Sequence, residues 1–157
     1  MAEQENLKLS KTTFDTLCKA MEHDNWHFIK HEEELKIECS AQGEDLPIDI
    51  TIFVDPERML IILMSRLPFI ISEKARVDAA VAVSAVNNSL AHGSFDYDIK
   101  TGRLFFRMSN SFRESLIGED LFMYMTTVAG VIVDRYNDKF FMLSKGIMSI
   151  EQFIDSI

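Results

Sequence analysis

The strongest constraint on the fold lies in residues 47–66, PIDITIFVDPERMLIILMSR. Every second residue from Ile48 to Val54 is apolar, which is the pattern of a strand with one buried face. The residues 55–58 have the composition of a turn, because proline sets the backbone angle of the second turn position. The following MLIILM is apolar on both faces, which is typical of a central strand covered on both sides. The segment therefore predicts a hairpin in the middle of a sheet.

Helical and strand patterns alternate along the rest of the chain. The sequence predicts a helix that begins at a Ser10 cap, two strands joined by HEEE (residues 31–34), the hairpin above, a helix from Ser72 to Gly93, two strands around Asp98–Gly102, a long helix ending at Gly146, and a short helix with a Ser149–Gln152 capping box. Strands grouped in hairpins between helices indicate an α+β fold, with an antiparallel sheet covered by helices. We expect residues 1–157 to form a single domain.

Composition and charge exclude several classes of protein. Hydrophobic residues make up 47% and charged residues 26% of the chain, which is ordinary for a globular protein. The net charge of −9 and the scattered basic residues argue against nucleic-acid binding. The start of the chain lacks a signal-peptide pattern, and no apolar run is long enough to cross a bilayer. We therefore expect a cytoplasmic protein without nucleic-acid partners or membrane insertion.

Residues 95–106, FDYDIKTGRLFF, contain two fragments that resemble known sites. Asp96, Asp98 and Gly102 suggest a calcium loop, but the fifth position is Lys100, a cation where an oxygen ligand is required. The KTG tripeptide of penicillin-recognising enzymes needs a serine followed three residues later by lysine, which the chain lacks. We interpret the stretch as a hairpin turn, in which Asp98 binds the backbone and Gly102 supplies a positive φ.

Other candidate sites are weaker. His23, His27 and His31 recur every four residues, which on one helix would align three zinc ligands, but Asp24-Asn25 interrupts that helix. We keep a metal-dependent enzyme that uses these histidines as a minor alternative. Cys18 and Cys39 are isolated and are interpreted as buried, inert thiols. Because no phosphate loop or catalytic motif is present, we expect no enzymatic activity, no cofactor and no metal.

The long helix carries more apolar residues than one sheet contact requires. One stripe is expected to contain Leu121, Met125, Val128, Ile132 and Tyr136, and further apolar residues extend beyond it. The helix is therefore either buried within its own domain or exposed to a partner, because methionine-rich faces adapt to varied partners. The residues predicted for a partner or dimer surface are Phe53, Ile61, Leu63, Phe105, Phe122, Met123, Met125, Val131 and Phe140.

Most of the chain, and its second half most clearly, resembles the bacterial YbjN family. The similar features are an asparagine at Asn87 or Asn88, the step Gly93-Ser94-Phe95, the turn Asp98–Gly102, and Tyr136, Phe140 and Gly146 with the ending SIEQFI. The chain departs from the family at Asn137-Asp138, where many relatives carry a proline. The family is grouped with sensory transduction regulators, and its fold is related to type III secretion chaperones. The resemblance implies a chaperone-like α+β domain, often dimeric, with no established enzymatic activity.

These observations favour a non-enzymatic module that binds a protein partner. The expected protein is a homodimer that holds an extended or helical peptide segment against its sheet. The alternative is a ligand-sensing regulator, with a pocket between the long helix and the sheet that is lined by methionine and aromatic side chains.

Overall fold

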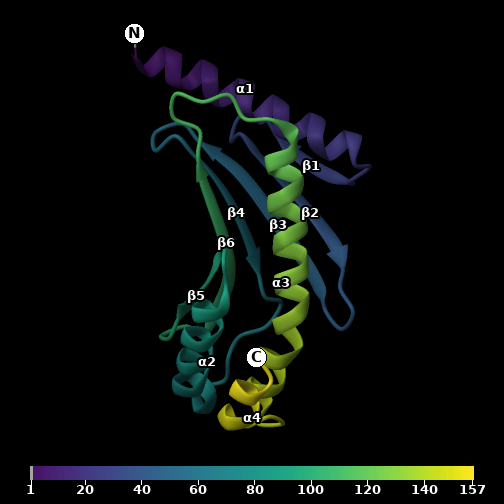
Figure 1. Cartoon of the computed structure of the whole chain (residues 1–157), viewed down its shortest axis with the longest axis vertical. Coiled ribbons are helices and arrows are strands. Elements are labelled where there is room, and N and C mark those ends of the chain that lie inside the picture. Colours follow the sequence, from purple (N-terminus) through teal and green to yellow (C-terminus); the bar gives the residue numbers. More distant parts are fainter. Residues whose placement is uncertain (1) are drawn as a thin grey trace.

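The computed structural model describes residues 2–157, in which helices and strands follow the order expected from the sequence. The elements are α1 (Ala2–His23), β1 (Phe28–His31), β2 (Lys36–Gln42), β3 (Pro47–Asp55), β4 (Leu60–Arg66), α2 (Arg76–Ser89), β5 (Ser94–Asp98), β6 (Arg103–Ser111), α3 (Glu119–Lys145) and α4 (Ile150–Asp155). A short 3-10 helix, Glu73–Ala75, precedes α2. The strands form one antiparallel sheet in the order β1-β2-β3-β4-β6-β5 (Figure 1). The predicted α+β fold class is confirmed.

The apolar strand β4 lies in the interior of the sheet, between β3 and β6. In this register Leu63 lies opposite Ile52 on one side and Met108 on the other. The β3–β4 turn is shaped by Asp55, whose Oδ1 accepts hydrogen bonds from the backbone N–H groups of Glu57 and Arg58, each at 3.0 Å. The central position of β4 and the turn chemistry predicted for residues 47–66 are confirmed, whereas helices of the described chain cover only one face of β4.

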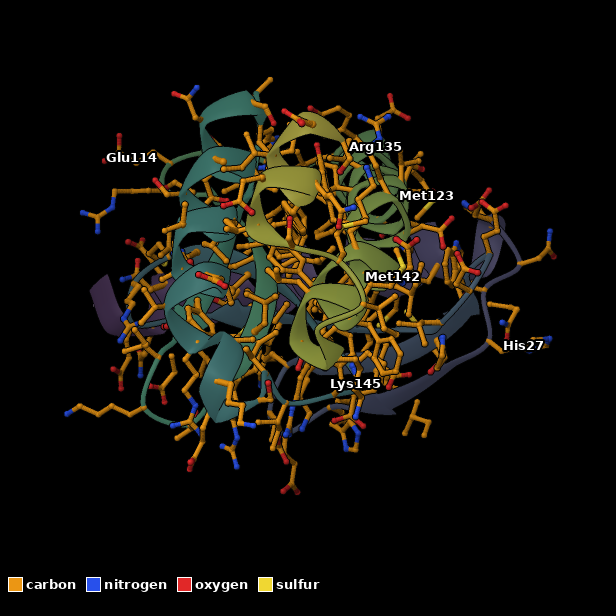
Figure 2. All side chains as sticks on the ribbon, turned by 90° about the horizontal axis from the view of Figure 1, so that it is seen from below. His27, Glu114, Met123, Arg135, Met142 and Lys145 are labelled. Carbon is orange, nitrogen blue, oxygen red and sulfur yellow. The ribbon has the colours of Figure 1, made fainter. Side chains whose placement is uncertain are left out.

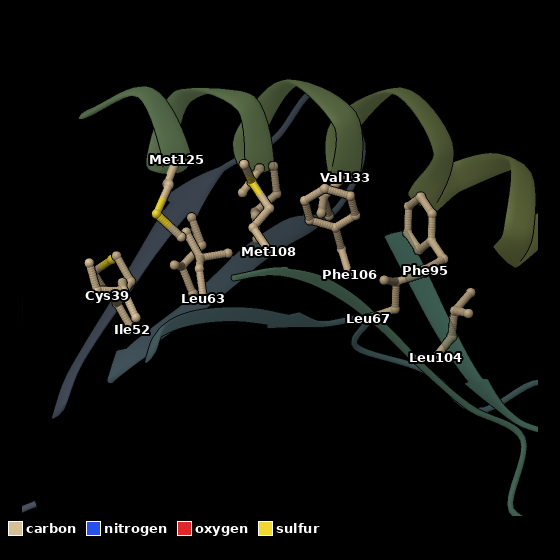
Figure 3. Packing of buried hydrophobic residues seen from close by; sticks show 14 of the residues in the cluster. Cys39, Ile52, Leu63, Leu67, Phe95, Leu104, Phe106, Met108, Met125 and Val133 are labelled. Atoms are coloured by element: carbon tan, nitrogen blue, oxygen red, sulfur yellow. The ribbon is translucent and has the colours of Figure 1, made fainter. Parts of the chain in front are cut away.

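The helices lie on one face of the sheet. α3 runs along the strands, α1 crosses one end of the sheet, and α2 and α4 lie at the other end (Figure 1). Figure 3 shows Met125 and Val133 of α3 above Leu63, Phe106 and Met108, and all five side chains are at most 1% exposed. The buried apolar residues form a cluster between the sheet and this helical layer.

The beginnings of two helices differ from the sequence prediction. Ser10 lies inside α1 and not at its start, because its hydroxyl donates to the carbonyl of Asn6 at 2.7 Å within a helix that continues to Ala2. Ser72 precedes the short 3-10 helix but makes no capping hydrogen bond. Its hydroxyl donates instead to the carbonyl of Ser144, at 2.7 Å, and so connects this segment to the end of α3.

The helix ends and the terminal cap follow local sequence signals more closely. Gly146 ends α3 in the left-handed conformation, with φ of 70°, as expected. Ser149 and Gln152 form the predicted capping box. However, α2 ends at Ser89 and not at Gly93, since Gly93, with φ of 80°, turns the chain into β5 instead. No helix within residues 2–157 combines the length and the apolar character needed to cross a bilayer.

Two glycines should respond in opposite ways to replacement by alanine. A Cβ atom at Gly93 would lie 2.3 Å from the ring of the buried Phe106, and the positive φ adds strain. Gly130 lies within α3, and a Cβ there would have no neighbour within 4 Å. We expect Gly93→Ala to lower the free energy of unfolding by about 2 kcal/mol or more. Gly130→Ala should raise it by roughly 0.5–1 kcal/mol. Urea denaturation measures both changes, and a neutral Gly93→Ala would contradict the described packing.

Candidate interaction surface

One face of the sheet carries apolar side chains but no helix of the described chain. Because strand residues alternate between faces, Ile52 and Leu63 point toward the helices whereas their neighbours point away. On this second face, which we call the open face, Phe53 lies opposite Ile62, and Phe105 lies opposite Arg66. Seen along the molecule, α2, α3 and α4 lie together on the other side of the sheet (Figure 2).

Five apolar residues of β3, β4 and β6 form the centre of the open face. We call them the open-face patch, and they are Phe53, Leu60, Ile62, Met64 and Phe105. Four of them are partly exposed, and Ile62 is shielded to 7% exposure although no described helix covers it. Contiguous apolar surface of this kind is a common mark of a binding site, because a partner that covers it removes apolar surface from water, which lowers the free energy.

Charged residues lie beside and within the open-face patch, and two of the cations, Lys36 and Arg107, already have partners within the chain. On the β2 side, Lys36 Nζ lies 2.8 Å from Glu34 and 3.2 Å from Glu38. The hydrogen bond from Lys36 lowers the pKa of Glu38. On the β5 side, the guanidinium of Arg107 pairs with the carboxylate of Asp96. These exposed pairs contribute little stability. The apolar side chains of the patch therefore remain the feature that a partner would contact, with Arg107 opposite Met64 and Arg66 opposite Phe105 beside them.

The structure corrects the predicted partner surface at five of its nine positions. The five residues with 0% exposure are Ile61, Leu63, Phe122, Met125 and Phe140, which all belong to the core. For β4 the reason is alternation: its odd-numbered residues face the helices, whereas Leu60, Ile62 and Met64 face outward. These three residues were not among those predicted, although the register of β4 with β3 assigns them to the outward face.

The remaining four predicted residues are accessible but lie on different surfaces. Phe53 and Phe105 belong to the open-face patch, while Met123 and Val131 lie on α3. Met123 is partly exposed, on a flank of the helix (Figure 2), and Val131 is 53% exposed. The buried stripe of α3 includes Met125 and Tyr136 as expected, but it continues through Phe122, Ala129, Val133 and Phe140. Leu121, Val128 and Ile132 lie at its border, where they are only partly buried.

The two edges of the sheet differ in how their backbone groups are protected. At the β5 edge, the side chain of Asn87 donates to the carbonyl of Phe95 at 3.0 Å and accepts from its N–H at 2.8 Å. The other edge is β1, which pairs with β2 alone among the described strands and exposes 63% of Ile29. A sheet edge without such protection can accept another strand, so β1 is the edge open to addition.

The three histidines predicted as a minor zinc possibility make separate contacts. His23 ends α1, and its Nδ1 lies 2.7 Å from Glu119 Oε2 at the start of α3. His31 lies on β1, with its Nε2 3.4 Å from Glu38, and His27 lies between the two elements. Within residues 2–157, no group of three or more histidine, cysteine or acidic side chains is arranged to hold a metal ion.

The stretch from Asp98 to Gly102 is a turn, as predicted. The carboxylate of Asp98 accepts hydrogen bonds from the Thr101 hydroxyl at 2.7 Å and the Lys100 N–H at 2.9 Å. These bonds, led by that of Thr101, lower the pKa of Asp98. Gly102 has φ of 75°, and Asp96 pairs with Arg107, so both carboxylates of the supposed calcium loop are engaged in local structure.

The two cysteines are free and buried. Loss of solvent on burial raises the pKa of both thiols, that of Cys39 to about 11. Because the thiolate is the reactive form, neither side chain is activated for nucleophilic chemistry.

Comparison with known proteins identifies the fold. No protein-family model and no curated protein sequence matches the chain. Its structure is similar to that of YbjN from E. coli, with TM-score 0.58 and 14% identity over 80% of this chain and 92% of the other. It is also similar to a chain of the ExsC–ExsE complex, with TM-score 0.54 and 12% identity over 81% and 91%. The expected likeness in fold to YbjN and to type III secretion chaperones is confirmed.

Adjacent asparagines at the end of α2 provide a matched test of the β5 edge. Asn87→Ala removes two hydrogen bonds and leaves the backbone groups of Phe95 without these partners. We expect this variant to lose about 1–3 kcal/mol of unfolding free energy in urea denaturation. The exposed Asn88 is the control, and Asn88→Ala should change stability by less than about 0.5 kcal/mol. Equal effects of the two substitutions would contradict the role assigned to Asn87.

Proposed function

We propose that the chain is a non-enzymatic, chaperone-like module that binds an apolar segment of a partner protein on its open-face patch. The observation that carries the proposal is the exposure of apolar side chains on a sheet face that no described helix covers. Burial of such surface contributes roughly 25 cal/mol per Å². When a partner segment covers several of these side chains, the favourable free energy of burial would therefore offset part of the conformational entropy that the segment loses on binding.

The open-face patch crosses three adjacent strands, β3, β4 and β6, which favours an extended segment with one apolar side. Ile29 of β1 lies opposite Glu38 of β2, on the same side of the sheet as the open-face patch. A segment added beside β1 would satisfy backbone groups at that edge but would lie outside the open-face patch, because β2 separates β1 from β3. A segment that covers the patch itself would, when extended, present alternate side chains to it. The favoured ligand therefore has apolar residues at every second position.

The similar structures support binding of a protein more than binding of a small ligand. ExsC was solved in complex with ExsE, so one chain of this fold is known in a protein complex. The alternative function, a ligand sensor, requires an apolar pocket between α3 and the sheet. Buried side chains including Met125, Val133 and Phe106 fill that interface (Figure 3). The open-face patch, in contrast, is an apolar surface that remains accessible.

Two synthetic peptides of the same composition test this proposal. In one, valine and threonine alternate, and in the other their order is scrambled. We expect the labelled alternating peptide to bind more tightly in fluorescence anisotropy. Phe53→Ser combined with Phe105→Ser should weaken its binding by about tenfold or more, equivalent to about 1.4 kcal/mol.

The control for this experiment is Val131→Ser, which removes an apolar side chain that is 53% exposed on α3. It should leave peptide binding within about twofold of the unmodified protein. Circular dichroism establishes that each variant is folded before binding is measured. The assignment of the open-face patch would be contradicted if the Phe53→Ser, Phe105→Ser variant bound the peptide as tightly as the unmodified protein. It would also be contradicted if Val131→Ser lost as much affinity as that double variant.

We also propose that two copies associate through the outer face of α2, which leaves the open face free for a partner segment. Val77 and Val81 are one helical turn apart on this face and are 69% and 46% exposed. Ala80 lies between them and is partly exposed, so a second α2 could approach closely. A two-fold axis beside the helix would bring the same residues of both copies together.

Light scattering tests the dimer. We expect twice the 18.0 kDa mass of the chain, and we expect the Val77→Asp, Val81→Asp variant to be monomeric, because association would bury unpaired carboxylates. The control is Leu116→Asp, at a loop residue that is 84% exposed, and it should remain dimeric. A monomer at high concentration of the unmodified protein would contradict the proposal.

A further inference from the structure

A groove lies beneath residues 4–15 of α1, where this helix crosses the β1–β2 and β3–β4 turns. One hollow, of about 580 Å³, lies between Leu7 and Phe14 of α1, Leu35 of the first turn and Pro56 of the second. A second hollow, of about 560 Å³, shares Leu7 and Pro56 with the first and extends past Glu57. We call the two together the α1 groove. It is built from the strand ends, whereas the open-face patch lies along the strands.

The floor of the α1 groove is apolar and includes an accessible side chain. Leu7 is 45% exposed, whereas Phe14 and Leu35 are buried beneath the surface at 1% and 7%. Pro56 provides a rigid wall, since it lies in the turn held by Asp55. An apolar side chain of a ligand could therefore enter between Leu7 and Pro56 and displace water from both.

The rim of the α1 groove is strongly acidic. The first hollow is lined by Asp15 and by the consecutive residues Glu32, Glu33 and Glu34, with Lys11 as its single cation. Lys30 and Lys36 pair with Glu32 at 3.5 Å and with Glu34 at 2.8 Å. Asp15 and Glu33 form no ion pair within residues 2–157, and both are exposed. Two carboxylates therefore remain beside the apolar floor for a cationic partner.

From this combination we infer that the α1 groove binds a cationic amphipathic segment of a protein partner, in which lysine or arginine residues flank a large apolar side chain. The acidic rim repels phosphate groups and acidic peptides, and it attracts ammonium and guanidinium groups. Because the floor of the groove is apolar, a lysine or arginine with an apolar neighbour in the sequence should bind more tightly than one without. This inference goes beyond the proposed function, because the surface and the ligand chemistry both differ from those of the open-face patch.

The experiment uses two fluorescein-labelled peptides, LKKLLKKL and LEELLEEL, with fluorescence anisotropy as the measurement. The full-length protein should bind the lysine peptide and not the glutamate peptide. Binding should weaken by about tenfold or more when the ionic strength is raised from about 0.05 to 0.5 M, since salt screens exposed charges. The Asp15→Lys, Glu33→Lys variant should lose about tenfold or more in affinity at low salt. Leu7→Ser should weaken binding severalfold at either salt concentration, because it removes the apolar contact.

A charge-matched control separates the groove from general attraction to an acidic protein. Asp45→Lys with Asp155→Lys changes the net charge by the same amount, at exposed residues of the β2–β3 loop and of α4. This variant should bind the lysine peptide within about twofold of the unmodified protein. The Phe53→Ser, Phe105→Ser variant should also retain binding, so the outcome does not depend on the open-face patch. Equal losses in the two charge variants, tight binding of the glutamate peptide, or no binding of the lysine peptide would each overturn the inference.

Discussion

Burial of α3 on the sheet determines which side of each strand faces the interior. Met125 and Val133 cover Leu63, Phe106 and Met108 (Figure 3). Because side chains alternate along a strand, this contact also determines that Phe53, Ile62 and Phe105 face away from the helices. A slip of one residue in β4 would exchange its buried and exposed apolar sets. The core and the open-face patch are thus two results of one packing arrangement.

The sequence predicted those parts of the fold that depend on residues close to one another in the chain. The Asp55 turn, the Asp98–Gly102 turn, the Gly146 stop and the Ser149–Gln152 cap are all local, and each is confirmed. The cap assigned to Ser10 was wrong, and Ser72 occupies the N-cap position of the 3-10 helix without making a capping hydrogen bond. Ser10 has an acceptor one turn earlier in a longer helix, and Ser72 finds its partner in Ser144, far along the chain. Because Ser72 and Ser144 are far apart in the sequence, no local sequence pattern could have indicated their contact.

The candidate site was less predictable than the fold. MLIILM is apolar at every position, so its composition could not tell which residues face the helices; the pairing of Leu63 with Ile52 and Met108 decides it. The alternation of residues 48–54 placed Phe53 on the face opposite Ile52, and the structure has it there. The α1 groove could not be read from the sequence, since Leu7, Leu35 and Pro56 come from three separate segments. Of its acidic residues, Glu32, Glu33 and Glu34 were recognised only as part of the turn between two strands, and Asp15 lies on a separate helix.

The order of strands has a consequence for how the chain assembles. β6, and not β5, lies beside β4, although β5 comes first in the sequence. The β5–β6 hairpin has a short local turn, whereas pairing of β4 with β6 must close a loop that contains α2 and β5. Loop closure becomes entropically more costly with length, and contacts distant in sequence slow folding. We therefore expect two preformed halves, β1–β4 and β5–β6, to join along the β4–β6 boundary in the late, slow step of folding.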